Sequence, residues 1–508
     1  MRALYTIDQV RAIDTAAMAT LPPGTLMQRA GLAAAHTAIG LLQVPLACAS
    51  VLIIAGPGNN GGDALVAAAA LAAAGVAVSV KLCGDPARLP VDALQAWHQI
   101  ASTSVRCVDE LPPTHWSLVI DGLFGIGLSR PIEGPLRALV ETINQLDCPR
   151  LSLDIPSGLN ADTGNVIGDG GSAVVATHTL TFIGDKPGLH TAAGRDFAGK
   201  VSVDALAIAP SLFMPTRIQL GSVDLFADAL RPRRHDSHKG SYGDVFVLGG
   251  ADGMTGAVLL AARAALHAGG GRVFGVFVGT VPTHDALHPE LMCRSADQIA
   301  YHQAVIVAGP GLGTSDRSQA ILINALRQPN LLVLDADALN LIAANPDLQT
   351  LVTQHATPVL MTPHPLEAAR LLGVSTASIQ SNRIGAARAL AQRYRATIIL
   401  KGSGTVIAQP DGSIVINPTG NAALATGGSG DVLSGVCGAL LAQGWSTWHA
   451  ALGAVWLHGS AADTLASKRI GPIGLTASEL PAAIRDELNT LTLSLTNRAS
   501  TFAAPPQS

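Results

Sequence analysis

The chain has 508 residues, of which 48% are hydrophobic and only 13% are charged, and its formal net charge is −4. This length predicts more than one domain, and the apolar fraction is sufficient for large buried cores. The charge excludes a broad basic surface, so nucleic acid is not an expected partner. Six scattered cysteines without a CxxC pair indicate free thiols in a reducing compartment rather than disulfides or a zinc site.

Neither a secretory signal nor a membrane span is expected. The N-terminus, MRALYTIDQVRAID, lacks the apolar core of a signal peptide. Residues 64–80 are nearly all apolar, but the run is short for a span, and Gly75 divides it into a helix and a Val-rich strand. We therefore expect a cytoplasmic protein without membrane contact. Its apolar content permits an extensive interface between copies, and we expect a homo-oligomer.

In the first half, expected strands alternate with expected helices. Helices at 8–18 and 25–42 come first, and the loop GPGNNGGD (56–63) leads from a strand into an Ala-rich helix. The strands expected here lie within 50–56, 117–125, 150–158 and 177–186. This alternation predicts a parallel sheet with helices on both faces, which binds ligands at the carboxyl ends of its strands.

A proline-containing segment around 205–240 interrupts this pattern and marks a linker or the entry to a domain. A second α/β series follows, with a helix at 255–268. Its strands are expected within 243–250, 271–279, 303–313, 331–340, 358–367 and 396–407. We place a first domain at 1–215, a linker at 216–235, a second domain at 225–495 and a disordered polar tail at 496–508.

The most informative stretch is ATGGSGDVLSGVCGALL, in which Gly427, Gly428, Ser429 and Gly430 precede Asp431 and an apolar helix. The first N–H groups of a helix lack intrahelical partners, so this turn is typical of a phosphate site. A carboxylate repels phosphate, but it is useful there if Asp431 removes a proton from a hydroxyl that attacks phosphorus. The alternative is that Asp431 is an ordinary N-cap.

Three further motifs follow expected strands in this half: VAGPGLG (307–313), TPHPLE (362–367) and KGSGT (401–405). The backbone of KGSGT suits a nucleotide phosphate, although a simple hairpin turn before TVIAQPDGSIVIN explains it equally well. His364 and Glu367 in TPHPLE favour a ligand site or, alternatively, a helix cap with a first-turn carboxylate. VAGPGLG is weak as a signal when it is taken alone.

The order GPGLG, TPxxxE, KGxxT and GxGD resembles the ribokinase-like superfamily. His364 stands where vitamin kinases of that group carry Asn, and this feature, with YGDVFVLGG and MTGAVLLAARAALHAGGG, resembles the ADP-dependent NAD(P)H-hydrate dehydratases over about 225–495. That family usually reads GNPGMATGGSGD, whereas this chain has Ala422 and Ala423 in place of Pro and Gly.

The resemblance implies a site for each of two substrates. The hydrated nicotinamide nucleotide would contact Ala257, Gly313, His364 and Asp431, with Asp431 as the catalytic base. ADP would contact Lys401, Gly402, Ser403, Gly404, Thr405 and Gly430, with Mg²⁺ as its cofactor. The hydroxyl on C6 of the hydrate would be phosphorylated by ADP, and loss of the phosphate would then restore NAD(P)H and leave AMP.

The first half carries NNGGD, DGLFGIGLSR and DIPSGLNADTG, each after an expected strand. The Gly-rich loop is neither a Walker A motif nor a GxGxxG fingerprint, and the Asp and Asn side chains could simply serve turns. Together the three motifs resemble the NAD(P)H-hydrate epimerase domain over about 1–215. The implied fold is a Rossmann-like α/β/α sandwich, beside a ribokinase-like α/β/α second domain.

This second resemblance also implies particular contacts. The hydrate would contact Asn59, Asn60, Gly61, Gly62, Asp63, Gly125, Ile126, Gly127, Leu128, Ser129, Arg130, Pro131 and Asp154. K⁺ would be held by Asn60, Asp121 and Ser157. Asp154 is the expected acid/base, and Lys186 is a second candidate that could equally be an ion-pair partner.

The two resemblances together imply a bifunctional enzyme that interconverts the R and S forms of hydrated NAD(P)H and dehydrates the S form with ADP. One alternative is a vitamin or sugar kinase fused to a ligand-binding module, which would release a stable phosphate ester. A second is that the first half is a non-catalytic scaffold. The sequence does not distinguish NADH hydrate from NADPH hydrate, or ADP from ATP.

Overall fold

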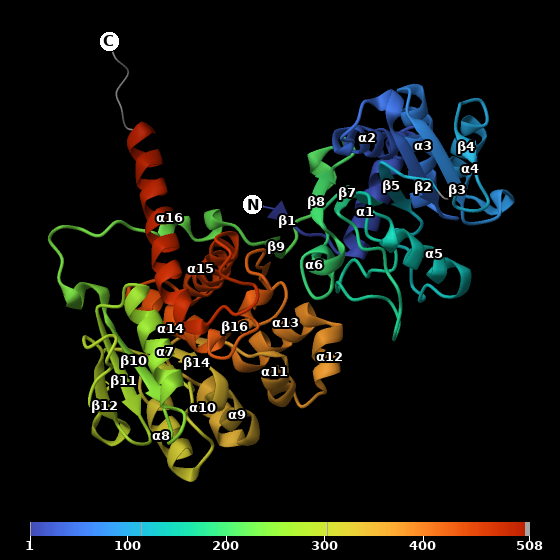
Figure 1. Ribbon diagram of the computed structural model, residues 1–508. Coiled ribbons are helices and arrows are strands. Elements are labelled where there is room, and N and C mark those ends of the chain that lie inside the picture. The colour runs from blue at the N-terminus through green and yellow to red at the C-terminus, as the bar shows by residue number, and fades with distance from the viewer. Residues whose placement is uncertain (1, 113, 302, 503–508) are drawn as a thin grey trace. The chain divides into compact units, whose positions relative to one another are not determined.

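The computed structural model describes residues 2–112, 114–301 and 303–502. The chain forms two compact units, Arg2–Ile218 and Gln219–Ser508 (Figure 1). The boundary falls inside the short strand β9 (Ile218–Leu220). Each unit is built on its own β-sheet with packed helices, so the α/β class that the sequence predicts is confirmed.

A seven-stranded sheet forms the centre of the N-terminal unit, and all its neighbouring strands run parallel. In spatial order the strands are β4 (Arg106–Cys107), β3 (Ala77–Leu82), β2 (Ser50–Ala55), β5 (Leu118–Gly122), β6 (Arg150–Leu153), β7 (His178–Phe182) and β8 (Lys200–Asp204). Central strands of such a sheet are buried on both faces, which explains the apolar runs in the sequence.

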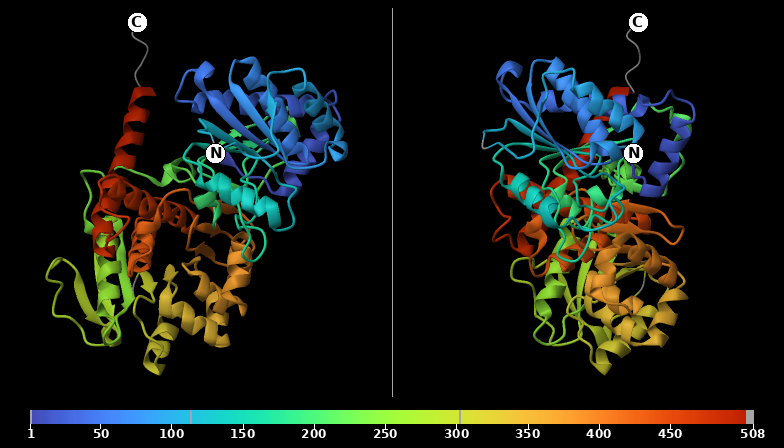
Figure 2. Two further views of the ribbon diagram at one scale, coloured as in Figure 1. Left: turned by 45° about the vertical axis from the view of Figure 1, so that its right-hand side comes forward. Right: turned by 90° about the vertical axis from the view of Figure 1, so that its right-hand side faces the viewer.

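Side chains of β2 alternate between two cores. Val51 and Ile53 belong to a core shared with α1 (Ile7–Met18), α2 (Thr25–Leu41), α3 (Asn59–Ala73) and α4 (Val91–Ile100). Leu52 and Ile54 point to the opposite face, where α5 (Gly134–Gln145) packs. The unit is therefore a three-layer sandwich with helices on both faces of the sheet (Figure 2).

The segment NNGGD is not a loop, as we expected, but the first turns of α3, which begins at Asn59. A Cβ on Gly61 would lie 2.0 Å from the carbonyl oxygen of Gly56, so only glycine lets the helix start this close to the end of β2. The N-cap residue Gly58 makes no side-chain capping bond. The free N–H groups at this helix end are consequently available to a ligand.

The C-terminal unit has a mixed sheet. Its strands in spatial order are β18 (Ile414–Ile416), β17 (Val406–Ala408), β16 (Thr397–Leu400), β15 (Val359–Met361), β14 (Leu332–Leu334), β13 (Val305–Ala308), β10 (Asp244–Gly249), β11 (Arg272–Phe277) and β12 (Met292–Ser295). Neighbours from β16 to β12 run parallel, whereas β16, β17 and β18 run antiparallel. KGSGT therefore forms the turn of the β16–β17 hairpin, as one of our two interpretations predicted.

Helices cover this sheet as well. In chain order they are α7 (Thr255–His267), α8 (Asp316–Leu326), α9 (Ala336–Ala344), α10 (Pro346–Thr353), α11 (Pro365–Leu372), α12 (Thr376–Ser381), α13 (Arg383–Tyr394), α14 (Ser429–Ala442), α15 (Thr447–Ser467) and α16 (Leu480–Phe502). Helices α7, α14 and α15 share one apolar core. None of the helices in the described ranges combines the length and the apolar character that a membrane span requires.

The predicted linker, 216–235, is partly packed against the C-terminal unit. Phe226 is 1% exposed, and its ring centroid lies 6.1 Å from that of Trp445 and 6.4 Å from that of Trp456. The longest run in this region without helix or strand is 230–238. The predicted disordered tail, 496–508, differs in its first part, because α16 reaches Phe502; 503–508 lie outside the described residues.

Candidate active sites

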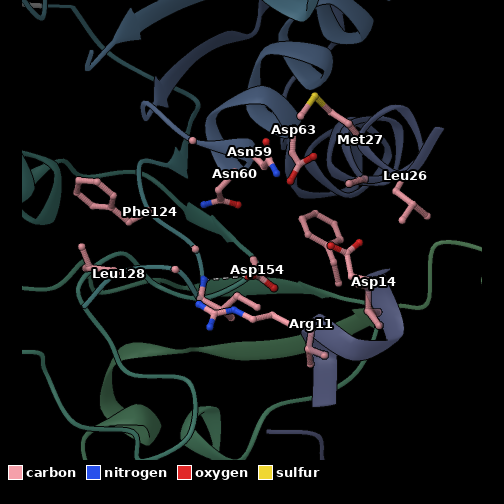
Figure 3. A pocket seen from close by; sticks show the side chains of 18 of the residues that line it. Arg11, Asp14, Leu26, Met27, Asn59, Asn60, Asp63, Phe124, Leu128 and Asp154 are labelled. Carbon is pink, nitrogen blue, oxygen red and sulfur yellow. Dashed lines mark hydrogen bonds between the residues drawn. The ribbon is translucent and has the colours of Figure 1, made fainter. Parts of the chain in front are cut away.

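A cavity of about 580 Å³ lies at the carboxyl ends of β2, β5 and β6 (Figure 3). Its wall includes the start of α3, the segment that follows β5, and Asp154 after β6. The predicted substrate contacts that line it are Asn59, Asn60, Asp63, Gly125, Ile126, Gly127, Leu128, Ser129, Arg130 and Asp154. Gly61, Gly62 and Pro131 do not belong to the lining; the two glycines instead allow close packing of α3.

Four aspartates from different elements line this cavity, and three of them are labelled in Figure 3: Asp14 on α1, Asp63 on α3 and Asp154; the fourth is Asp92 on α4. Burial raises the pKa of Asp63 well above its ordinary value, and the charges of Asp154 and Asp14 raise it further. Burial, with a smaller contribution from Asp154, also raises the pKa of Asp14. Asp63 and Asp14 therefore hold a proton in this cavity more readily than they would in solvent.

Asp154 is the best-anchored of these carboxylates. Its Oδ1 lies 2.8 Å from Lys186 Nζ, and its Oδ2 accepts a hydrogen bond of 3.2 Å from the N–H of Ile126. Lys186 is fully buried, and its ammonium also donates to Thr181 Oγ1 (2.6 Å) and to the carbonyl of Phe182 (2.9 Å). The backbone φ of Asp154 is 65°, a left-handed conformation that non-glycine residues adopt only when their surroundings impose it.

The predicted potassium ligands lie beside the cavity. Asn60 is 9% exposed, and neither its Oδ1 nor its Nδ2 has a hydrogen-bond partner. Asp121 is fully buried; its carboxylate accepts hydrogen bonds from Ser152 Oγ (2.8 Å), Ser157 Oγ (2.6 Å) and two N–H groups. Buried polar atoms almost always find partners, so the Asn60 amide is the member of this set that is suited to an added ligand.

In the C-terminal unit, Asp431 does not cap its helix. The N-cap of α14 is Gly428, with φ 88°, and Asp431 lies in the first helical turn without a capping bond. The N-cap interpretation is therefore wrong. Burial raises the pKa of Asp431 to about 7, and the negative charge of Asp335 adds to this effect. A carboxyl group with such a pKa is suited to accept a proton near neutral pH.

Lys401 lies between this helix start and a group of acids. Its Nζ is 2.7 Å from Asp335 Oδ1 and 3.9 Å from Glu367 Oε2. A Cβ on Gly430 would lie 3.3 Å from the same Nζ, so the ammonium also borders the start of α14. Burial raises the pKa of Glu367 to about 7. Lys401, Glu367, Asp431 and Asp335 thus form one electrostatic cluster.

His364 is the N-cap of α11, which confirms the capping interpretation. Its Nδ1 accepts hydrogen bonds from the N–H groups of Leu366 (3.1 Å) and Glu367 (3.3 Å), so the ring proton lies on Nε2. Glu367 returns the bond by accepting from the N–H of His364 at 2.7 Å. Burial and nearby Lys401 lower the pKa of His364, which keeps the ring neutral.

The remaining predicted contacts lie on segments that the fold holds in place. Gly313, with φ 73°, donates its N–H to Asp337 Oδ2 at 2.9 Å, and Ala257 is on α7. In the β16–β17 turn, Thr405 Oγ1 donates to the carbonyl of Gly402 at 3.0 Å. Beneath the turn, Arg383 is 2% exposed and donates to the carbonyl oxygens of Leu400 and Lys401, both at 3.2 Å.

Sequence reasoning missed several acidic residues of these sites. Asp14 lies on an amphipathic helix far from the motifs in sequence, and nothing in its pattern marks it. Asp335 directly follows β14, and Asp337 lies in the first turn of α9. Acidic residues just after a strand of a parallel sheet often face a ligand site, and this pattern could have indicated both residues.

Comparisons with known proteins found matches for both units. Residues 245–485 match the family model described as NAD(P)H-hydrate dehydratase, and residues 23–188 match that described as YjeF-related protein N-terminus. A bifunctional NAD(P)H-hydrate repair enzyme from Escherichia coli is 38% identical over 89% of this chain and 88% of its own length. The enzyme of that name from Coxiella burnetii is 37% identical over 96% of this chain and 100% of its own length.

Among solved structures, an ADP/ATP-dependent NAD(P)H-hydrate dehydratase from Bacillus subtilis, co-crystallised with ATP and Mg²⁺, is 32% identical. The match covers 53% of this chain and 97% of that chain, with a TM-score of 0.47. The full-length similarity and the two family models lead to one conclusion: this chain belongs to the family of bifunctional NAD(P)H-hydrate repair enzymes.

Proposed function

We propose that the two units catalyse successive repair steps on hydrated NADH and NADPH. The N-terminal unit, for which we set the domain 1–215, interconverts the R and S forms at C6. The C-terminal unit, the domain 225–495, dehydrates the S form with ADP and yields NAD(P)H, AMP and phosphate. The observation that carries this proposal is Asp431 in the first turn of α14: its carboxylate makes no capping bond, and burial raises its pKa to about 7.

In dehydration, Asp431 removes the proton of the C6 hydroxyl, and that oxygen attacks the terminal phosphorus of ADP while the bond to AMP breaks. The nitrogen lone pair of the ring then expels inorganic phosphate from C6 of the phosphate ester, and loss of the neighbouring C5 proton restores the double bond. Lys401 and the N–H groups at the start of α14 stabilise the charge on the transferred phosphoryl group. The hydrate contacts are Ala257, Gly313, His364 and Asp431, and those of ADP are Lys401, Gly402, Ser403, Gly404, Thr405 and Gly430.

Mg²⁺ fits the second site as a partner of the nucleotide. Within the described ranges, no three His, Cys, Asp or Glu side chains are grouped as a ready-made metal site. Mg²⁺ is commonly held by one or two carboxylates together with substrate phosphates, and the buried carboxylate of Glu367 can supply the protein ligand. When bound, Mg²⁺ would neutralise phosphate charge during the transfer.

In epimerisation, the C6 hydroxyl leaves and water returns on the opposite face of the ring. Asp154 is the acid/base that handles the proton of this water, and Lys186 keeps its carboxylate aimed into the cavity. K⁺ suits the unpartnered Oδ1 of Asn60, because this hard cation prefers oxygen ligands. Asp121 and Ser157 complete the proposed set, and bound K⁺ would shape the loop around the ring.

Mixing the protein with ADP, Mg²⁺ and the hydrate tests this proposal. Absorbance of the reduced nicotinamide should return, whereas a kinase that releases a stable phosphate ester would leave the absorbance flat. Asp431→Asn should stop dehydration and leave epimerisation intact. Asp154→Asn should do the reverse, and an unchanged rate of epimer interconversion in this variant would exclude Asp154 as the acid/base.

We also propose a cytoplasmic location and a homo-oligomeric state. All six cysteines are free thiols, which fits a reducing compartment. Fractionation of cells that make the tagged protein tests the location, and light scattering of the purified chain tests the assembly. A mass equal to that of the single chain would exclude the oligomer.

A further inference from the structure

The segment Asp335–Asp337 contacts two parts of the C-terminal site without belonging to any predicted contact set. It follows β14 and enters α9. Asp335 is 1% exposed, and its Oδ1 lies 2.7 Å from Lys401 Nζ. Two residues later, Asp337 Oδ2 accepts the N–H of Gly313 at 2.9 Å. One side chain therefore reaches the proposed nucleotide side and the other reaches the proposed hydrate side.

The backbone of this segment is tightly fixed. A Cβ on Gly309, with φ 129°, would lie 1.7 Å from the carbonyl oxygen of Asp335, so GPGLG passes directly against it. The N–H of Asp335 donates to the carbonyl of Ala308 at 3.0 Å, and Ala336 adopts a left-handed φ of 47°. Such a conformation persists only where the surroundings determine it, and it aims the two acids in different directions.

Each acid has one main task. Lys401 is a flexible side chain, and a buried carboxylate at 2.7 Å restricts its ammonium to the border of α14. Gly313 ends the glycine-rich turn and has no side chain of its own, and the bond to Asp337 fixes the direction of its N–H. Asn340 supports Asp337 with a hydrogen bond of 3.4 Å from Nδ2 to Oδ1.

We propose that Asp335 and Asp337 are positioning residues with separate effects: Asp335 acts on ADP through Lys401, and Asp337 acts on the hydrate through Gly313. The proposal rests on the proposed dehydratase function. It assigns the fixed turn between β14 and α9 as the element that sets the relative placement of the two substrates. Neither acid needs to touch a reacting atom for this role.

The experiment uses the full-length chain with Asp335→Asn and Asp337→Asn, and with Asp347→Asn as a matched control. Asp347 is exposed in the first turn of α10, and among the residues that the structure describes it makes no ion pair with Lys401. For each protein, KM is measured for ADP and for the hydrate with the other substrate saturating, and calorimetry gives the Kd of ADP with Mg²⁺. Asp335→Asn should raise the KM and Kd of ADP about tenfold and leave the KM of the hydrate within about twofold.

Asp337→Asn should show the opposite split, with a KM for the hydrate about tenfold higher and an unchanged Kd for ADP. Equal effects of both variants on both substrates, or no effect, would overturn the proposal. A double-mutant cycle distinguishes the proposed role from a folding defect. In a Lys401→Met background, adding Asp335→Asn should cause no further rise in the Kd of ADP. An additive rise would show that Asp335 does not act through Lys401.

Because calorimetry measures ADP binding without turnover, failure of this proposal can be distinguished from failure of the proposed dehydratase function. If the wild-type protein binds ADP but does not restore the reduced nicotinamide, the dehydratase assignment fails. The effect of Asp335→Asn on the Kd of ADP is still measured in that case, and an unchanged Kd would overturn the role of Asp335 by itself.

Discussion

Replacing Asp431 by Asn should abolish dehydration and at the same time stabilise the C-terminal unit above neutral pH. The pKa of Asp431 rises from 3.8 to about 7 in the folded chain, chiefly through burial. Between these two values the folded state binds more protons than the unfolded state, so the free energy of unfolding falls as pH rises. Ionised Asp431 therefore destabilises the fold most above pH 7 and not at all below about pH 4.

The size of this effect follows from the shift. About three pKa units at roughly 1.4 kcal/mol each give an upper value of about 4 kcal/mol. Asp431 is only partly buried and the positive charge of Lys401 lies nearby, so we expect a gain of about 2 kcal/mol for Asp431→Asn. Asn is nearly isosteric, and α14 is capped by Gly428, so the substitution removes no helix cap.

Urea unfolding without nucleotide or Mg²⁺, followed by fluorescence, measures this gain, because Trp445 and Trp456 pack in the core of this unit. The variant should be more stable than the wild type at pH 8, and the difference should shrink as the pH falls and vanish below about pH 4. A difference that stays equal across this pH range would refute the argument from burial. Retained dehydration in the same variant would refute the role of Asp431 as the base.

Three further substitutions test other parts of the structure. Lys186→Met removes the ammonium that holds Asp154, so epimerisation should fall at least about tenfold while dehydration stays unchanged; equal epimerisation rates would contradict this. Gly309→Ala places a Cβ against the carbonyl of Asp335, so urea unfolding should show a loss of more than about 2 kcal/mol, and a neutral result would mean that the backbone can move. Phe226→Ala should lower the free energy of unfolding by about 3–5 kcal/mol, which a flexible linker at this position would not do.

Patterns local in sequence predicted much of this fold. Buried strands can be recognised in a sequence as short apolar runs. The runs that form β2 and β5, with Gly75 separating a helix from a strand, therefore predicted the layered α/β architecture of the N-terminal unit. The start of α3 was less predictable. Glycines usually favour a loop, but Gly61 lies in the first turns of a helix, where the carbonyl of Gly56 leaves no room for a side chain.

The candidate sites were predictable to the extent that motifs mark strand ends. Asn60 and Asp154 were predicted from strand ends, and Asp431 was predicted from a glycine-rich helix start. Contacts between distant segments were not, because nothing in the local pattern of Asp335 indicates that Lys401, 66 positions later, will meet it. His364 could not be assigned from the sequence for another reason. The motif TPHPLE is compatible with both a ligand site and a helix cap, and only the structure shows the capping bonds.

The buried guanidinium of Arg383 has a consequence for affinity. By holding the carbonyl oxygens of Leu400 and Lys401, it fixes the direction of the backbone that leads into Gly402 before any nucleotide arrives. A mobile turn would lose conformational entropy on binding, and this loss would subtract from the contact energy. In this chain that entropy is already lost when the protein folds, so a larger share of each proposed phosphate contact would remain as affinity for the nucleotide.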